Sequence, residues 1–551
     1  MLRVHCGFGV LTAILFVSGR LAHLPAAEID ERPNVVFILA DDLGIGDVEC
    51  YGRERCAIET PHLDSLARDG MRFTDAHCVA SVCVPSRIAI MTGRYPWRFQ
   101  PPKPDGPWGF LNPRLRTDAY TLGRTLQHSG YRTGYVGKWH LGTLMQTTDG
   151  NNQGPTNVDY TKPLKVGPSD YGFDYSFVLP GSLDMFPYAF VKNGKFVGSV
   201  TAQKGWSAFN RVGPAAEDFE DVKVLDTFST QAEEFIAEAA TSTPAQQPFF
   251  LYLALTAPHT PTSPSRKFEG KSDLGLYGDF VMETDNCAGR VLAALKRHGI
   301  EDNTIVVASS DHGAGAYAGN IRKATPGQLK LLEKNGHYAS GIYRGYKFSL
   351  YEGGLRVPLL VRWPNVVKAG SQCDRLVGLI DIFRTCVELA NTDSSDDAGV
   401  DSVSLVPLLR NPDSPPVRQT FVMQSIRAFA FRSGKWKLAL CPGSGCPGVY
   451  GNRPTQDEAW KKALADYGRS PSNRNELLRA PFVQLFDVEA DPTESINLAS
   501  TNEAQVREMI EHLDAQIARG RSTPGPSQTN DRERINYLSG VPRYVLGGGK
   551  R

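Results

Sequence analysis

The run Val35-Val36-Phe37-Ile38-Leu39-Ala40, followed at once by Asp41-Asp42, is the first clear indication of the fold class of this 551-residue chain. The stretch is apolar without polar alternation and rich in β-branched or aromatic side chains, as in strands buried on both faces of a parallel sheet. Three more runs share this design, at residues 133–136, 249–255 and 304–308. Four such runs predict a large parallel sheet.

Amphipathic stretches lie between these runs, at residues 61–68, 122–128 and 280–297. Each is followed by a glycine that can end a helix. Strands that alternate with helices are typical of a doubly wound α/β fold. We therefore predict a large mixed, mostly parallel sheet flanked by helices.

The chain changes character after Asn411-Pro412-Asp413-Ser414-Pro415-Pro416. A smaller C-terminal antiparallel sheet plus a helix is predicted by four short strand patterns and one helical pattern, at residues 421–424, 429–432, 436–440, 484–488 and 503–518. We expect an N-terminal α/β domain over residues 28–414 and a small α+β subdomain over residues 415–551.

Residues 1–27 have the pattern of a signal peptide. Arg3 and His5 precede an apolar run at residues 7–18, and the small pair Ala26-Ala27 follows. The pattern predicts a secreted or periplasmic protein, with an uncleaved anchor as the alternative. No later segment is apolar and long enough to cross a bilayer, so no stable membrane span is expected after signal cleavage.

The charge balance excludes some partners. The chain has 60 Lys+Arg against 59 Asp+Glu, a net charge of +1, so nothing favours nucleic acid as a ligand. Among its ten cysteines, Cys441 and Cys446 are spaced to close a short disulfide loop, and unpaired thiols are the alternative for the rest.

Polar side chains follow each of the four buried runs directly. The side chains are those of Asp41 and Asp42, Lys138 and His140, His259, and Asp311 and His312. Ligands of open α/β sheets bind beyond the carboxyl ends of the strands. The sequence therefore predicts that four separate segments converge on one site.

A further segment, at residues 83–87, has the pattern of an anion-binding site. Cys83-Val84-Pro85-Ser86-Arg87 opens a predicted helix that runs to about Gly93, with proline in its first turn. A helix N-terminus binds oxyanions, and Arg87 adds a planar fork of donors for the same anion. Taken alone, Cys83 is either a reactive thiolate or a packed cysteine.

The string from Cys83 to Arg94, with Cys-x-Pro-Ser-Arg followed by Thr-Gly-Arg, resembles the signature of the type I sulfatases. These are formylglycine-dependent enzymes of the arylsulfatase family, within the alkaline phosphatase superfamily. The resemblance continues at residues 40–44, 137–142, 257–259, 310–313, 347–358 and 485–498. It spans most of the chain and implies a hydrolase that acts on sulfuric esters.

The resemblance implies that Cys83 is oxidised by a maturation enzyme to formylglycine (3-oxoalanine), which works as the hydrate. One hydroxyl attacks sulfur and its neighbour later expels sulfate. It also implies one metal ion held by Asp41, Asp42, Asp311 and His312 together with residue 83. Three carboxylates suit Ca²⁺ or Mg²⁺, and the family favours Ca²⁺.

Further roles follow from the matching family positions. Lys138 and Lys347 would hold sulfate oxygens, with Lys138 also touching the nucleophile. His140 would take the proton of the hydrate, and His259 would bind sulfate and protonate the leaving alcohol. Ser182 matches a further sulfate-side serine in a looser motif.

Export and a neutral charge balance suit a sulfated sugar or polysaccharide as the substrate, while simple aryl sulfates would be cleaved at the same core. The alternative enzyme is a phosphoesterase or phosphonate hydrolase of the same superfamily. A binding protein with an unmodified Cys83 is the third possibility. The four-ligand metal cluster and two lysines favour the sulfatase.

Overall fold

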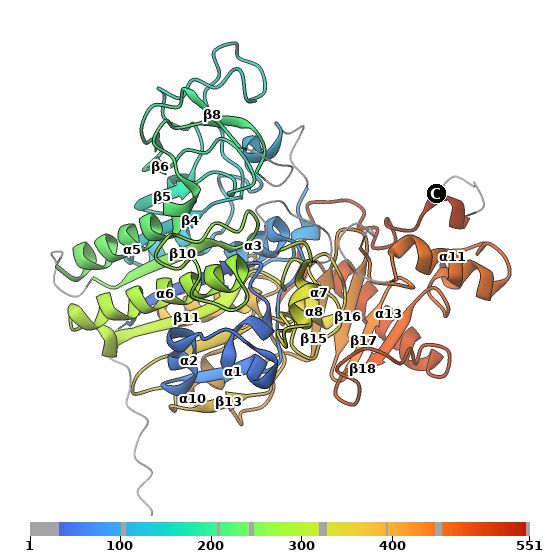
Figure 1. Ribbon diagram of the computed structural model, residues 1–551. Helices are drawn as coiled ribbons and strands as arrows, with labels where there is room; N and C mark the ends of the chain where they lie inside the picture. Colours follow the sequence, from blue (N-terminus) through green and yellow to red (C-terminus); the bar gives the residue numbers. More distant parts are fainter. Residues whose placement is uncertain are drawn as a thin grey trace, which may run out of the picture. The chain divides into compact units, whose positions relative to one another are not determined.

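The computed structural model (Figure 1) describes residues 32–100, 106–205, 210–241, 247–318, 328–392, 395–446 and 454–546. The predicted signal peptide over residues 1–27 lies outside this range. Within the described residues, no helix is both long enough and apolar enough to cross a membrane.

A ten-stranded sheet forms the centre of the unit Pro33–Arg551. Its middle strands, β11 (Thr304–Ser310), β1 (Asn34–Asp41), β10 (Phe249–Pro258) and β4 (Arg132–Lys138), are mutually parallel neighbours. They are the four predicted buried runs. The outer strands make the sheet mixed, in the order β13 (Ser371–Cys373), β2 (Met71–Phe73), β12 (Leu359–Arg362), β11, β1, β10, β4, β5 (Tyr175–Leu179), β6 (Val191–Lys192), β7 (Lys195–Phe196).

Both faces of this sheet are buried, as the unbroken apolar runs predicted. Along β1, Val35, Phe37 and Leu39 belong to one hydrophobic cluster, and the alternate side chains belong to another. Helices α3 (Cys83–Thr92), α4 (Leu122–His128) and α9 (Ile382–Leu389) contribute to the first cluster, and α2 (Pro61–Arg68), α5 (Val224–Thr241) and α6 (Leu276–Arg297) to the second. In Figure 1, α5 and α6 lie side by side along the sheet.

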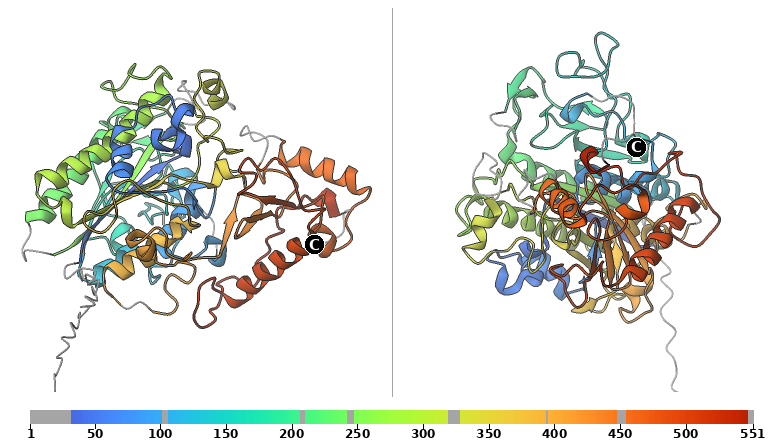
Figure 2. Two further views of the ribbon diagram at one scale, coloured as in Figure 1. Left: turned by 90° about the horizontal axis from the view of Figure 1, so that it is seen from below. Right: turned by 90° about the vertical axis from the view of Figure 1, so that its right-hand side faces the viewer.

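The C-terminal part contains the predicted antiparallel sheet of four strands. They are β15 (Thr420–Gln424), β16 (Phe429–Ser433), β17 (Trp436–Ala439) and β18 (Gln484–Asp487), with α11 (Gln456–Tyr467) and α13 (Glu503–Arg519) beside them (Figure 2). The predicted fold class is confirmed. Phe421, Phe431 and Leu438 extend the first cluster of the large sheet, so the two sheets share one core. The boundary near residue 415 stays a prediction.

The remaining elements are short. They are β3 (Ala76–His77), β14 (Val377–Gly378), β8 (Ala202–Lys204), β9 (Gly213–Ala215), α1 (Glu49–Gly52), α7 (Gln328–Glu333), α8 (Glu352–Leu355), α10 (Val406–Arg410) and α12 (Arg474–Leu477). In the loop after β17, Cys441 is a thiol that donates to the carbonyl of Gly443 at 3.1 Å, and it is not half of a disulfide.

Candidate active site

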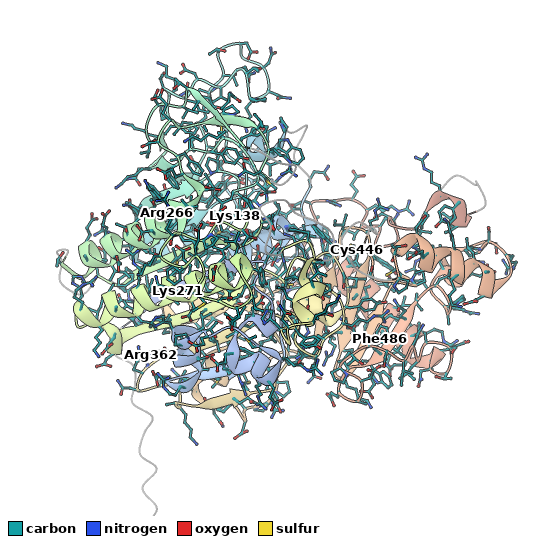
Figure 3. The ribbon with its side chains drawn as sticks, in the orientation of Figure 1. Lys138, Arg266, Lys271, Arg362, Cys446 and Phe486 are labelled. Atoms are coloured by element: carbon teal, nitrogen blue, oxygen red, sulfur yellow. The ribbon has the colours of Figure 1, made fainter. Side chains whose placement is uncertain are left out.

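The four middle strands end at one edge of the sheet and carry the predicted polar residues there. The register of β1 shifts after Leu39, so that Asp41 pairs with Pro258, the residue before His259. Asp311 follows β11, and its backbone amide donates to the carbonyl of Ala40 on β1 at 3.1 Å. Lys138, at the end of β4, lies near the centre of the view in Figure 3. Parallel pairing therefore brings these segments together.

Cys83 is the first residue of α3, and it meets this edge. Ligand atoms of Asp41, Asp42, Cys83 and His312 all lie within 4.8 Å of one another, and all four residues are buried. The thiol donates to Asp41 Oδ1 at 3.5 Å, and His312 Nε2 lies 3.2 Å from Sγ. Two carboxylates, a ring nitrogen and residue 83 thus surround one point, which is a geometry that can hold a divalent ion.

Asp311 and Arg87 lie beside this group. Arg87 Nε donates to Asp311 Oδ2 at 3.0 Å, and Nη1 donates to the carbonyl of Lys138 at 3.3 Å. Asp311 Oδ1 lies 3.4 Å from His312 Nε2, but Asp311 is not one of the four residues whose ligand atoms all lie within 4.8 Å of one another. Arg87 is buried and holds the carboxylates in place.

Each of the two adjacent carboxylates has its own lysine. Lys138 Nζ pairs with Asp41, and Lys347 Nζ lies 2.6 Å from Asp42 Oδ1 and 3.4 Å from the sulfur of Cys83. Burial raises the pKa of both carboxyl groups, but the neighbouring cations outweigh burial, and the pKa of Asp41 lies well below its usual value. Both carboxylates are therefore ionised and able to act as ligands.

The two predicted catalytic histidines differ in their surroundings. His259 Nδ1 donates to the carbonyl of Thr260, and Nε2 lies 3.8 Å from Asp42 Oδ2. Burial, and then the charge of Lys138, hold the pKa of His140 well below its usual value. His140 Nδ1 is buried and has no hydrogen-bond partner among the described residues. His140 is thus a neutral imidazole next to cations.

Ser182 is the predicted site residue that the structure does not join to the cluster. Its hydroxyl is buried and has no hydrogen-bond partner in the described part of the chain. It lies two residues after Pro180, whose carbonyl accepts a hydrogen bond from the amide of His140 at 3.1 Å. Ser182 therefore belongs to a segment that borders the site.

The sequence reasoning missed Tyr317. Its hydroxyl donates to Asp42 Oδ2 at 2.9 Å and lies 3.3 Å from His259 Nε2, so it bridges the metal-ligand group and a histidine. Tyr317 follows His312 in the loop after β11, where an aromatic residue stands among glycines and alanines. That isolated aromatic was the only signal available.

The backbone is strained at three site positions. Asp42, His140 and Phe348, the neighbour of Lys347, have φ values of 65°, 51° and 73°. Such left-handed conformations are unfavourable for side chains with a Cβ, and for bulky residues above all. Their occurrence within or next to three separate site segments supports the assignment of a functional site here.

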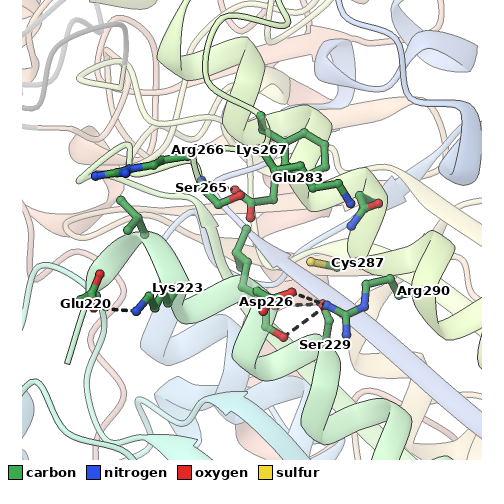
Figure 4. Close-up of a pocket in the computed structure, with 14 residues that line it drawn as sticks. Glu220, Lys223, Asp226, Ser229, Ser265, Arg266, Lys267, Glu283, Cys287 and Arg290 are labelled. Carbon is green, nitrogen blue, oxygen red and sulfur yellow. Dashed lines mark hydrogen bonds and ion pairs between the residues drawn. The ribbon is translucent and has the colours of Figure 1, made fainter. Parts of the chain in front are cut away.

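A cavity of about 840 Å³ lies elsewhere, between the first turns of α5, the middle of α6 and the segment 265–268 (Figure 4). None of the predicted site residues is among the residues that line it. Several of its charges pair with one another: Arg290 bonds Asp226 at 2.7 Å, and Lys223 bonds Glu220 at 2.7 Å. Neither of the two groups of side chains that could hold a metal ion among the described residues lines this cavity.

Known proteins are similar to this chain over most of its length. A family model described as Sulfatase matches residues 33–392. The N-acetylgalactosamine-6-O-sulfatase of Bacteroides thetaiotaomicron is 32% identical, over 88% of this chain and 93% of the relative. The steryl-sulfatase of Rattus norvegicus is 30% identical, over 91% of each chain.

A solved structure agrees with these relatives. It is a sulfatase from work on glycosaminoglycan metabolism by Bacteroides thetaiotaomicron, with a TM-score of 0.72 and 30% identity. The match covers 88% of this chain and 99% of the solved one.

Proposed function

This chain belongs to the sulfatase family, and we propose that it removes sulfate from sulfated carbohydrates, with residue 83 as the nucleophile beside a divalent metal ion. As a sulfatase it is a sulfuric ester hydrolase. One observation carries the proposal for the site: the side chain that starts α3 lies among carboxylates, lysines and a histidine from four separate segments.

Residue 83 needs chemical activation before it can act. Burial raises the pKa of the Cys83 thiol, and Lys138 and Lys347 only partly oppose this, so an unmodified thiolate is disfavoured at neutral pH. The family implies that a maturation enzyme converts this cysteine to formylglycine. As the hydrate, this group supplies one hydroxyl that attacks the sulfur of the sulfate ester and a second hydroxyl whose deprotonation releases sulfate. The sulfur of Cys83 marks the place of that oxygen.

The donor set fits a hard divalent ion. Asp41, Asp42 and Asp311 offer carboxylate oxygens, His312 offers Nε2, and residue 83 offers an oxygen once modified. The family implies a divalent metal, and we propose Ca²⁺, with Mg²⁺ as the alternative. Bound there, such an ion would withdraw negative charge from sulfate and from residue 83.

The cations and histidines take the remaining roles. Lys138 and Lys347, whose amines already lie beside the carboxylates, would bind sulfate oxygens. His140 has a lowered pKa, so it is neutral and able to accept a proton from residue 83. His259 lies 3.8 Å from Asp42 and would donate the proton that the leaving alcohol requires.

The carbohydrate substrate is supported by the relatives. The bacterial relative at 32% identity is named for N-acetylgalactosamine 6-sulfate, and the match spans nearly its whole length. Export by the segment at residues 1–27 would bring the enzyme to such substrates.

Two further proposals complete this assignment. Ser182 would contact the sulfate group in the same site. A C-terminal subdomain would begin at about residue 415.

Sulfate release from a panel of sulfated mono- and oligosaccharides tests the substrate class. Protein co-expressed with a formylglycine-generating enzyme should release sulfate from at least one sugar, and Cys83→Ala should release none. Hydrolysis of aryl sulfates alone would overturn the carbohydrate assignment.

Mass spectrometry tests the modification. The tryptic peptide that ends at Arg87 contains Cys78 and Cys83. The active protein should show one sulfur and two hydrogens lost and one oxygen gained at residue 83, with Cys78 unchanged as an internal control. Full activity with an intact thiol at residue 83 would contradict the mechanism.

A further inference from the structure

We propose that Trp108 and Arg211, with Asp184 as a positioning residue, form a sugar-binding subsite next to the sulfate site. This inference rests on the proposed carbohydrate substrate. It deepens that proposal by naming the residues that would hold the pyranose ring and its hydroxyl groups.

The three residues meet on the segment that borders the catalytic site. His140 donates its amide to Pro180, and Ser182 and Asp184 follow in the next four residues. Trp108 reaches the same segment from a distant part of the chain, because the amide of its neighbour Gly109 donates to the carbonyl of Phe186 at 3.0 Å. The segment thus connects a catalytic histidine with an exposed tryptophan.

Arg211 is fixed in place but keeps spare donors. Its Nη1 donates to the carbonyl and to Oδ2 of Asp184, at 2.7 and 3.0 Å. The preceding residue, Asn210, holds this segment in place, because its Nδ2 donates to the carbonyl of Leu183 at 3.0 Å. The side chain of Arg211 is 21% exposed, and its bonds to Asp184 use Nη1, which leaves the Nε and Nη2 donors outside that pairing. These donors can reach ligand hydroxyls.

Trp108 supplies an apolar surface beside these donors. The guanidinium carbon of Arg211 lies 3.6 Å from the centre of its ring, while 42% of the residue remains exposed. Its φ of 57° is a left-handed conformation that bulky residues rarely adopt. A strained, exposed indole held beside a cation is typical of a residue that contacts a ligand.

The chemistry of the pair favours a neutral sugar ring. An indole face packs against the apolar C–H face of a pyranose, and a guanidinium donates to its hydroxyls. Asp184 neutralises Arg211, which makes a second sulfate a poorer ligand than a hydroxyl group. Asp184 is itself buried and acts on the ligand through Arg211, which its carbonyl and Oδ2 hold.

Steady-state kinetics with two substrates test this subsite. The sulfated monosaccharide that the wild type cleaves fastest is compared with 4-nitrophenyl sulfate. In Trp108→Ala and Arg211→Met, kcat/KM for the sugar should fall about tenfold relative to the aryl sulfate, mainly through KM. Val212→Ala, at an exposed neighbour of Arg211, and Arg116→Met, in an exposed Arg–Asp pair, are matched controls that should keep the wild-type ratio.

Asp184→Asn tests positioning separately. In the wild-type background it should lower kcat/KM for the sulfated sugar relative to kcat/KM for the aryl sulfate. In the Arg211→Met background it should cause no further decrease, since Asp184 acts through Arg211. Thermal unfolding of each variant checks that it folds.

The outcomes separate the two proposals. A wild type that cleaves only the aryl sulfate overturns the carbohydrate function and the subsite with it. The subsite alone is overturned if the wild type cleaves the sulfated sugar but the variants keep the wild-type ratio of kcat/KM between sugar and aryl sulfate. The same holds if the variants lose activity equally on both substrates, because the ratio is then unchanged.

Discussion

Asp41 and Asp42 are neighbours in the sequence, yet both carboxylates face the same cluster. Successive side chains of an extended strand point to opposite sides. The left-handed φ of 65° at Asp42 breaks this alternation at the end of β1. Lys138 can then pair with one carboxylate and Lys347 with the other. One strained residue therefore creates a site with two acids and two cations.

His259→Ala tests the acid role at this scale. Sugar alcohols are poor leaving groups and need a proton, whereas phenolates leave without one. We expect kcat/KM to fall about 10²–10⁴-fold for a sulfated sugar and far less for 4-nitrophenyl sulfate. His512→Ala, at an exposed histidine on α13, is the control. Equal losses on both substrates would exclude His259 as the proton donor.

The end of β4 shows how an element positions a catalytic group. Gly137 has a φ of 119°, and a Cβ there would lie 1.8 Å from the carbonyl oxygen of Ala254 on β10. Glycine is thus required for β4 to pair with β10 up to the residue before Lys138. The close approach of the two strands sets the position of the lysine.

Gly137→Ala should therefore be destabilising, by about 1–3 kcal/mol or more, and should also lower activity. Gly434→Ala is the matched control, because its φ of 54° is also left-handed but its Cβ would meet open space. Urea unfolding of both variants measures the difference. Similar losses in the two variants would show that conformation alone, without the clash, is responsible.

Helix α2 starts with a cap that α6 provides. Asp285 on α6 accepts hydrogen bonds from the amides of Leu63 and His62, at 2.7 and 3.1 Å. Burial raises the pKa of Asp285 to about 7, although these hydrogen bonds oppose the rise. Between these two pKa values, the Asp285 carboxyl group is protonated in the folded state but ionised in the unfolded chain, where its pKa is about 3.9.

This shift predicts a stability that falls with pH. Between about pH 4 and pH 7 the folded state binds more protons at Asp285, so the free energy of unfolding decreases as pH rises through this range. In Asp285→Asn the amide oxygen still caps α2, and this part of the slope should vanish. Urea unfolding at pH 5 and pH 8 measures it. An unchanged slope in the variant would assign the pH dependence to other groups.

On the scale of the whole molecule, a buried charge network joins the two sheets. Glu352, on α8, accepts from Arg356 Nε at 2.7 Å and lies 2.9 Å from His77 Nε2. Lys437, on β17 of the small sheet, bonds both Glu352 and Glu494 at 2.8 Å. The cations offset burial and hold the pKa of Glu352 well below its usual value. Burial instead raises the pKa of Glu494 to about 7, although Lys437 opposes this rise.

Lys437→Met should destabilise the protein by about 3–5 kcal/mol, because it removes the buried cation that Glu352 and Glu494 share. Activity should also fall, since α8 begins five residues after Lys347. Lys435→Met, which removes an exposed partner of Asp487, should have a much smaller effect. Thermal unfolding together with aryl sulfate turnover tests both. Equal effects of the two substitutions would contradict a coupling through the network.

Much of the fold could be predicted because its signals are local in the sequence. The apolar runs of β1, β4, β10 and β11 identify buried parallel strands, and glycines mark several helix ends. The predicted helices at residues 61–68 and 122–128 match α2 and α4 residue for residue. Parallel topology then dictates that the carboxyl ends of the strands share one edge.

Local patterns in the sequence were enough to predict the four middle strands, the small antiparallel sheet, several helices and the residue types that converge, since periodicity and motifs act over a few neighbouring positions. Which charges pair depends on the tertiary structure, as in the pairing of Lys347 with Asp42 across 305 residues. It alone brought Tyr317 to His259 and Arg211 to Trp108, and it alone merged the cores of the two sheets. Contacts between distant segments depend on packing in three dimensions, because a buried charge must find a partner wherever the folded chain brings one.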